Sequence, residues 1–592
     1  MAPTRYEQQG RSGAASSTHY LGTATAMAVL ARGGNAFDAA VAAGFVLQVV
    51  EPHLCGPGGE VPAVFVRASD PRPRVLCGQG VAPAAATAER LREAGLSIVP
   101  GTGLLAATVP GAWDGWLTLL RDHGTIELAE ALEPALGYAA SGFPLVPRIP
   151  LAIAAVAEHF RAHWTSSAAT WLPGGRVPAA GSTMTLPALA ATWRELLAEA
   201  HGRTREQRID AARDAWYRGF VAEEIDAFCR RRVRDETGRD HAGLLVADDL
   251  ARWSASYEDA VVVDVGDGWA VAKPGPWSQG PVLPQMLQLI GPAEYADGVA
   301  TADTVHRVVE AAKLAFADRE AWYGDSAPVP LAGLLSPAYA EARRALIGPE
   351  ASLELRPGSP GGRPPRLPVR AARPGDVRGS GLRGVGLGEP TIDRRGATRG
   401  DTVHVDVVDA AGNMISATPS GGWLQSSPTI PALGFCLGTR AQMFWLEPGL
   451  PASLVPGRRP RTTLSPSLGL RSGEPRLAFG TPGGDQQDQW QLCFWLAHTA
   501  GGLDLQAAID SPAWHSTAFP SSFAPRGWEP GGVVAESRLG AGMLDELRRR
   551  GHTVTDAGPW TLGRMCAVGR GGGRLLRAGA DTRSGVGAAA AF

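Results

Sequence analysis

The sequence predicts a mixed α/β (α+β) protein, because helical and strand patterns occupy different parts of its 592 residues. From Leu119 to about Ile347 the spacing of apolar residues is mainly helical. After Thr402 the chain becomes rich in short strands. The stretch between them, residues 355–400, is rich in Arg, Pro and Gly. Such a composition buries too little apolar surface to offset its ordering entropy, so we expect a flexible linker there. A basic tail for an acidic partner is the alternative.

Two helices are expected near the N-terminus, over residues 23–30 and 36–50. The second should end at Glu51, because the residue before a proline is disfavoured in the α region. It is apolar on nearly every side, which predicts burial. A glycine-rich turn at residues 55–59 then leads into a strand over residues 61–66. No strand precedes a GxGxxG pattern, so a dinucleotide-binding fingerprint is not supported.

The clearest helical patterns in the middle of the chain cover residues 187–201, 207–231 and 301–322. Pro187 suits a first helical position, and Thr301 suits an N-cap. A strand pair is expected within residues 260–271. After Thr402, strands are expected at 403–408, 414–418, 467–470 and 476–479, with a final set over 565–576.

Composition excludes several classes of partner. A formal net charge of −2 gives no general attraction to nucleic acid or to anionic membranes. The six cysteines are scattered without a CxxC pair, and no histidine cluster has metal-ligand spacing, so we expect no metal site and no disulfide scaffold. Residues 1–20 are polar, and no apolar run reaches membrane-spanning length. We therefore expect a cytoplasmic protein.

Thr402 opens a segment that is typical of a strand followed by a turn at residues 409–413. A threonine that becomes N-terminal through chain cleavage can act as a nucleophile, with its own α-amine as the base. Thr402 at the end of the linker therefore suggests a proenzyme. The alternative is a threonine that merely begins a strand after a surface loop.

Two later clusters carry further chemistry. Residues 461–467 place adjacent hydroxyl groups before a strand. Residues 480–485 place two glycines directly after a strand, and the backbone N–H groups of such a turn can form an oxyanion hole. Each cluster alone is also common in ordinary loops.

In this order, these segments resemble the γ-glutamyltranspeptidase family of N-terminal-nucleophile hydrolases over nearly the whole chain. The stretches that carry the resemblance are residues 33–40, 109–111, 133–135, 141–143, 315–319, 402–404, 409–413, 465–466 and 481–484.

The resemblance implies a four-layer αββα fold and self-cleavage between Asp401 and Thr402. The products would be a large portion, residues 1–401, and a small portion, residues 402–592, which stay associated. In the mature enzyme the freed amine of Thr402 would take the hydroxyl proton as the oxygen attacks substrate. No cofactor is implied.

Individual roles carry over to matching positions. Gly483 and Gly484 match the oxyanion-hole positions. Ser420 falls where the family carries a hydroxyl, usually Thr, that bonds the nucleophile. Thr462 and Thr463 fall on paired serines that contact the substrate carboxylate.

The departures bear on the substrate. Gln79 replaces the arginine that pairs with the α-carboxylate of a γ-glutamyl group, and an amide cannot supply that charged fork. Gln442 and Met443 stand where acids are expected to receive the α-ammonium. Gly422 replaces a substrate-binding asparagine. No acidic residue occurs between Pro419 and Leu446, so a glutamyl zwitterion should bind poorly.

Other side chains in this region suggest what the pocket accepts instead. Arg440 is a candidate contact for an anion, or else a solvated surface residue. Trp423, Phe444 and Trp445 suggest an apolar or ring-bearing substrate, although core packing is the favoured explanation for any one of them.

The leading hypothesis is a self-processing threonine hydrolase for a small-molecule acyl or amide substrate that is not a standard γ-glutamyl compound. One alternative is a C–C bond hydrolase that releases oxalate in a bacterial pathway to pyrroline units or antibiotics, which suits the Ala-, Arg- and Gly-heavy composition. Another is a glutathione hydrolase or γ-glutamyltransferase with a rearranged glutamate site. The last is a non-catalytic relative that acts as a binding or scaffold protein.

Overall fold

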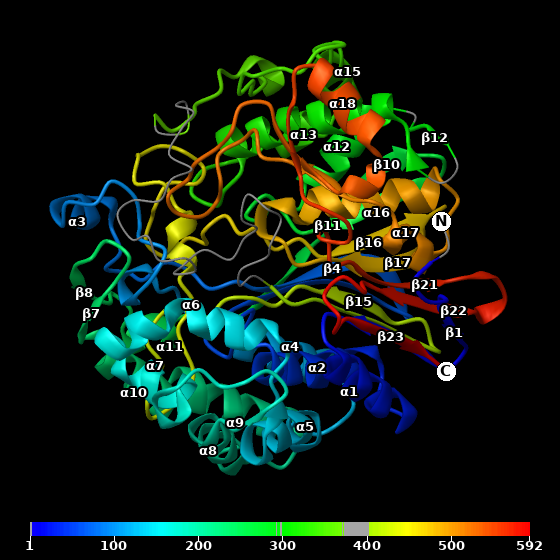
Figure 1. The fold of residues 1–592 in the computed structure, drawn as a ribbon. Coiled ribbons are helices and arrows are strands. Elements are labelled where there is room, and N and C mark those ends of the chain that lie inside the picture. The colour runs from blue at the N-terminus through cyan, green and yellow to red at the C-terminus, as the bar shows by residue number, and fades with distance from the viewer. Residues whose placement is uncertain (1–2, 292, 297–298, 370, 372–401) are drawn as a thin grey trace.

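Two seven-stranded antiparallel sheets lie face to face in the computed structural model, which describes residues 3–291, 293–296, 299–369, 371 and 402–592 (Figure 1). The first sheet has the order β1 (Gln8–Gly10), β22 (Leu576–Ala580), β21 (Cys566–Arg570), β17 (Glu474–Gly480), β16 (Ser467–Arg471), β11 (Trp269–Lys273) and β10 (Val261–Gly266). The second has the order β23 (Ala588–Ala591), β2 (Gly13–Ser17), β14 (Val405–Asp409), β15 (Met414–Ala417), β3 (Val61–Arg67), β4 (Asp70–Gly78) and β9 (Ser256–Asp259).

Helices cover the outer face of each sheet (Figure 1). The second sheet is covered by helices that include α1 (Tyr20–Ala31), α2 (Ala36–Val50), α4 (Ala112–His123) and α5 (Leu128–Ser141). The first is covered by helices that include α12 (Val282–Ile290), α13 (Ala302–Trp322), α16 (Gln487–Thr499) and α17 (Leu505–Asp510). This arrangement confirms the expected four-layer αββα fold.

The two sheets bury small and branched side chains between them. Alternate residues of each strand point to the same face, so each strand supplies side chains to this inner layer. The inner layer contains Ala14, Val64, Val75, Val408 and Met414 from one sheet and Ala272, Leu468, Ala478, Val568 and Ala578 from the other. Helix α2 lies against β14 on the outer face, and every one of its residues is buried, as its apolar sequence predicts.

One predicted helix is wrong in its extent. The pattern over residues 207–231 forms two helices, α9 (Arg205–Tyr217) and α10 (Phe220–Cys229). Gly219 separates them with φ −116° and ψ −149°, which is extended rather than helical backbone. A Cβ at Gly219 would lie 2.7 Å from the carbonyl oxygen of Ala215, so the close turn requires glycine.

Other boundaries agree with the sequence within a few residues. Helix α8 (Pro187–Ala198) begins at the predicted proline, and Thr301 caps α13 by accepting a hydrogen bond from Thr304 N. The strands expected at 260–271 and 565–576 each form a strand pair. Residues 355–369 belong to the expected linker. Part of this segment is hydrogen-bonded to the loop after residue 446, because Arg366 donates to the carbonyl oxygen of Gly449 at 3.2 Å. Residues 372–400 lie outside the described part of the chain.

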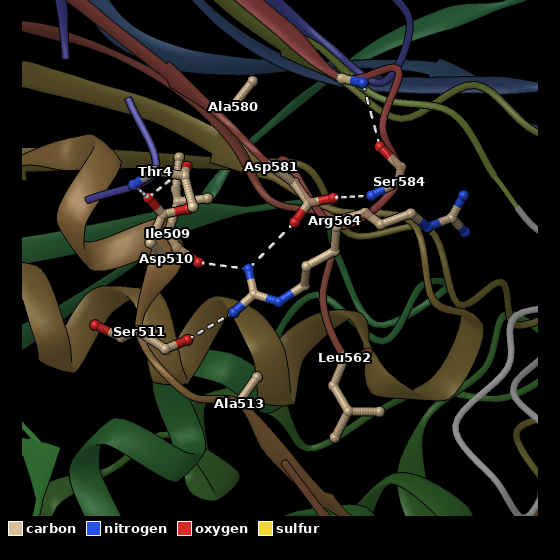
Figure 2. A network of polar contacts seen from close by, with 12 residues as sticks. Thr4, Ile509, Asp510, Ser511, Ala513, Leu562, Arg564, Ala580, Asp581 and Ser584 are labelled. Atoms are coloured by element: carbon tan, nitrogen blue, oxygen red, sulfur yellow. Dashed lines mark hydrogen bonds and ion pairs between the residues drawn. The ribbon is translucent and has the colours of Figure 1, made fainter. Parts of the chain in front are cut away.

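Both ends of the described chain are held by the rest of the fold. Strand β1 pairs with β22, and β23 pairs with β2. Thr4 donates to the carboxylate of Asp510 at the end of α17, and the backbone N–H of Ser584 donates to Asp581 (Figure 2). Strand β2 pairs in turn with β14. Segments from before and after Thr402 therefore alternate within one sheet. None of the described helices is long and apolar enough to cross a membrane.

Candidate active site

Thr402 lies just before β14. Its backbone forms an isolated β-bridge with the loop that follows β15. It pairs with Ser420 in an antiparallel bridge, and Val403 N donates to the carbonyl oxygen of Pro419 at 3.1 Å. The Thr402 Oγ1 atom lies 3.2 Å from Ser420 Oγ, and both residues are buried. The structure therefore brings together the two hydroxyl groups that the sequence predicts to interact. Asp401, the other side of the predicted cut, lies outside the described residues.

A buried ion pair lies behind Ser420. Arg440 Nη2 donates to Ser420 Oγ at 2.8 Å, and Arg440 Nε donates to Glu60 Oε1 at 2.6 Å. The guanidinium also lies 5.1 Å from the ring centre of Trp423, within cation–π range. Burial raises the pKa of Glu60, and the charge of Arg440 opposes that shift. Arg440 is thus neither a solvated surface residue nor a cation without a carboxylate.

The hydrogen bond from Arg440 determines the role of the Ser420 hydroxyl. A guanidinium only donates, so Ser420 Oγ accepts from Arg440, and the same oxygen lies within hydrogen-bond distance of Thr402 Oγ1. Glu60 was missed by the sequence analysis, since an acid next to Gly58 and Gly59 in a turn gives no sign of its distant partner. Its backbone also pairs with Ser420, with N–H···O distances of 2.8 and 3.0 Å.

The strand that follows Thr402 is held by a buried polar cluster. His404 Nδ1 lies 2.9 Å from Thr418 Oγ1, and His404 Nε2 lies 2.9 Å from Asp406 Oδ1. Burial raises the pKa of Asp406. A Cβ at Gly480 would lie 2.2 Å from His404 Cε1, so the end of β17 touches the histidine. The glycine loop that follows β17 therefore begins beside the segment that carries Thr402.

That loop has a backbone that only glycine fits. Gly483 has φ 133°, and a Cβ there would lie 2.4 Å from Trp490 Cζ3. Gly484 has φ 50°. Asp485 fixes the far side of the loop by pairing with Arg319 and by accepting from Ser522 N at 2.8 Å. The turn is therefore fixed in place, and its backbone N–H groups remain the predicted oxyanion-hole donors.

Gly483→Ala should therefore impair both folding and self-cleavage. The strained backbone costs about 1–3 kcal/mol, and the clash with Trp490 adds to it. Gly473→Ala is the matched control, because Gly473 also has positive φ (80°) but no atom within 4 Å of its Cβ position. Denaturant unfolding and the fraction of cleaved chain measure the difference. Equal losses in the two variants would show that the contact with Trp490 does not matter.

The paired hydroxyls differ in their hydrogen bonding. Thr462 Oγ1 accepts from Leu464 N at 3.3 Å, whereas Thr463 Oγ1 is buried with no partner among the described residues. Gln279 connects this pair to the glycine loop: its N–H donates to Thr462 O at 2.9 Å, and its side chain donates to Gly484 O at 3.2 Å. Thr463 is therefore the hydroxyl with unused hydrogen-bonding capacity.

The positions that would recognise glutamate hold no charge. Gln79 Oε1 is buried without a partner among the described residues. The Gln442 side chain donates to Gly101 O at 3.2 Å and accepts from Ala524 N at 3.3 Å. Gly422 has φ 64°, and a Cβ there would lie 2.9 Å from Gly59 N, which leaves no room for asparagine. Met443, Phe444 and Trp445 are buried.

A family model named gamma-glutamyltranspeptidase matches residues 22–591. The chain belongs to the γ-glutamyltranspeptidase family. Together with the αββα fold, this membership makes it an enzyme of the hydrolase and transferase class.

Curated relatives in this family match almost end to end. The chain is 29% identical to "Acylase ACY 1 proenzyme" of Pseudomonas sp. (strain SE83), over 94% of this chain and 90% of the relative. It is also 29% identical to "Oxamate amidohydrolase proenzyme" of Klebsiella pneumoniae subsp. pneumoniae, over 98% of each chain.

Solved structures show the same architecture. The structure of LmbA2991HD is 54% identical, covers 100% of both chains and has a TM-score of 0.93. A cephalosporin acylase from Bacillus halodurans is 26% identical, with a TM-score of 0.82 over 100% of this chain and 98% of the acylase.

Two expectations about other sites can be compared with the structure. All six cysteines are buried and free. No group of three or more metal-ligating side chains gathers anywhere in the described ranges.

Proposed function

We propose that the chain cleaves itself between Asp401 and Thr402, and that Thr402 then attacks the carbonyl carbon of a small acyl or amide substrate that is not a γ-glutamyl compound. The observation that carries this proposal is the contact between Thr402 Oγ1 and Ser420 Oγ at 3.2 Å, with Arg440 donating to Ser420 from behind. A threonine that only began a strand would have no need of a buried guanidinium behind its hydroxyl partner.

In the proposed reaction, the α-amine of Thr402 removes the hydroxyl proton as Oγ1 bonds to the substrate carbonyl carbon. The carbonyl oxygen becomes negative and accepts hydrogen bonds from the N–H groups of Gly483 and Gly484. Collapse of this intermediate breaks the bond to the leaving group, which takes the proton from the amine. Water then attacks the Thr402 ester by the reverse proton path and releases the acid.

Ser420 and Arg440 have a positioning role in this scheme. The hydrogen bond from Ser420 directs a lone pair of Thr402 Oγ1 away from the substrate and stabilises negative charge on that oxygen. Arg440 fixes the Ser420 hydroxyl in the donating orientation, and Glu60 fixes Arg440. Water is poorly placed to do the same, because the four side chains are almost completely buried.

The substrate assignment rests on missing charges. A γ-glutamyl group presents a carboxylate and an ammonium, each of which needs a partner of opposite charge. Gln79 and Gln442 supply neither charge at the positions concerned, and Gly422 lacks the amide of the family's asparagine. The acylase and oxamate amidohydrolase among the relatives favour an acyl or amide bond of another kind.

Incubation with γ-glutamyl-p-nitroanilide tests the substrate assignment. We expect the processed protein to release p-nitroaniline at least 100-fold more slowly than a family member with both charged partners, because losing such a partner costs several kcal/mol. Gln79→Arg is the informative variant, since it restores one charge. Rapid release by the unchanged protein would contradict the proposal and favour a rearranged glutamate site.

Mass spectrometry of the processed protein after exposure to candidate acyl donors tests the nucleophile directly. We expect an acyl adduct on the N-terminal peptide that begins with Thr402. Identification of the released product then distinguishes an amine leaving group from a carbon leaving group, which would indicate C–C bond hydrolysis. An adduct on another residue would contradict the assignment of Thr402.

A further inference from the structure

Arg526 is a buried cation with most of its hydrogen-bonding capacity unused. Its side chain is almost fully buried, and Nη2 donates to the carbonyl oxygens of Gln442 at 2.5 Å and Phe444 at 2.9 Å. Nε and Nη1 have no partner among the described residues. The guanidinium stacks 4.1 Å from the ring centre of Trp445. Buried polar groups are normally satisfied, so two unused donors on one guanidinium require an explanation.

The charges around Arg526 do not balance. Its charged neighbours are Arg319, Arg461, Glu320 and Asp485. Arg319 pairs with Asp485 and with Glu320, and Arg461 also pairs with Glu320 at 2.7 Å. Three buried guanidinium groups thus face two carboxylates.

Arg526 is the cation that this arrangement leaves without a carboxylate. Burial, and then the charge of Arg461, lowers its pKa to about 9. An unpaired buried charge costs several kcal/mol, and a single anion would balance the cluster.

The backbone at Arg526 is also unusual. Its φ is 71°, in the left-handed region that non-glycine residues seldom occupy. Backbone in this region is strained for a residue with a side chain and occurs disproportionately at functional sites. Here the conformation directs the side chain under Trp445 and towards the carbonyl groups of residues 442 and 444.

The loop that carries Arg526, residues 521–527, contacts three segments of the candidate site. Ala524 N donates to Gln442 Oε1 at 3.3 Å. Ser522 N donates to Asp485, which directly follows Gly484. Arg461, which directly precedes Thr462, lies 3.4 Å from Ser522 Oγ. The loop that carries Arg526 therefore lies where the segments of the glycine loop, the hydroxyl pair and Gln442 converge.

We propose that Arg526 binds a carboxylate of the substrate through the donor Nη1. The substrate class is then an acyl or amide compound that also carries a carboxylate, held by a residue outside the positions that read glutamate. This inference rests on the proposed function and narrows it. Nε–H and Nη1 face different edges of the planar guanidinium, so a single carboxylate would bind at Nη1, whose N–H groups have no partner among the described residues, and the charge of the group would strengthen these hydrogen bonds.

Matched pairs of small amides test the inference. The anionic probes are oxamate, malonamate and succinamate, and each has a neutral partner in oxamide, malonamide and succinamide. Inhibition of Thr402 acylation gives the affinity of the processed protein for each probe. We expect at least one anion to bind 10-fold or more tightly than its neutral partner.

Variants locate the charge preference. Arg526→Gln should reduce the anion-to-neutral ratio to near one, and Arg526→Lys should keep part of it, because lysine retains the charge but places it on a different, more flexible side chain. Arg471→Gln is the control: Arg471 also stacks on a tryptophan, Trp269, but on β16 away from the site. It should leave the ratio unchanged.

Each outcome bears on a different claim. Equal binding of all three pairs by the unchanged protein overturns the inference, whatever the variants do. A preference that survives in Arg526→Gln also overturns it. If Arg526→Gln does not fold, the unchanged protein and Arg526→Lys still decide. Failure of the proposed function looks different, because the unchanged chain would then remain uncut or carry no adduct on Thr402.

Discussion

Thr402→Ala should abolish self-cleavage and leave one chain on a denaturing gel, whereas the unchanged protein should give two chains, residues 1–401 and 402–592. Alanine has no oxygen to attack the preceding carbonyl, so no residual rate is expected from this route. N-terminal sequencing of the smaller chain should begin Thr402-Val403-His404. Circular dichroism should show the variant folded, because the side chain removed is small.

Thr499→Ala is the control for this experiment. Thr499 lies at the end of α16 and donates to the carbonyl oxygen of Trp495 at 2.7 Å, away from the glycine loop. The Thr499→Ala variant should cleave itself at the same rate as the unchanged protein. Cleavage of Thr402→Ala at the same bond would contradict the proposed nucleophile, and two uncleaved proteins would favour the non-catalytic alternative.

Arg440→Met should destabilise the protein and slow cleavage at the same time. It leaves the Glu60 carboxylate buried without its cation, at a cost of about 3–5 kcal/mol. It also removes the donor that orients Ser420, for which we expect a rate loss on the order of 100-fold, as for an oxyanion-hole donor. Denaturant unfolding and the rate of cleavage measure the two effects separately.

The double variant Arg440→Met with Glu60→Gln separates structure from positioning. Replacing the carboxylate by an amide removes the unpaired charge, so most of the stability should return. The cleavage rate should stay low, because Ser420 still lacks its donor. Recovery of both properties together would show that the ion pair has only a structural role.

The pH dependence of the single variant gives an independent check. Burial raises the pKa of Glu60, so the folded state binds its proton more readily than the unfolded state does. Stability then falls as pH rises above the ordinary glutamate value of 4.5. Loss of Arg440 removes the charge that opposes this shift, so the fall above pH 4.5 should be larger in Arg440→Met than in the unchanged protein.

Local patterns in the sequence were sufficient to predict the strands on either side of the linker and to recognise the family resemblance. The alternating valines after Thr402 form β14, and the all-apolar helix over residues 36–50 is buried throughout. Family membership and the αββα fold followed from ordered short matches, each too weak alone. Local propensity failed at Gly219, where one close contact with Ala215 divides a continuous helical pattern.

The charges behind the site could not be predicted, because their partners are far apart in the chain. Glu60 and Arg440 are separated by 380 residues, and neither stands in a pattern that signals an ion pair. Arg526 is conspicuous only because of what surrounds it, namely Trp445 and two backbone carbonyl groups. Whether a side chain is buried, and which charge it pairs with, depends on contacts between distant segments. These contacts form only in the folded chain and leave no local pattern in the sequence.

The alternation of strands in the second sheet constrains when the chain can cut itself. Strand β14, directly after Thr402, pairs with β2, and the other edge of β2 pairs with residues 588–591. The sheet that aligns Thr402 is therefore complete only after synthesis has reached those residues. An unfinished chain on the ribosome lacks that edge, so we expect the proposed cut before Thr402 to wait until residues 588–591 have paired with β2.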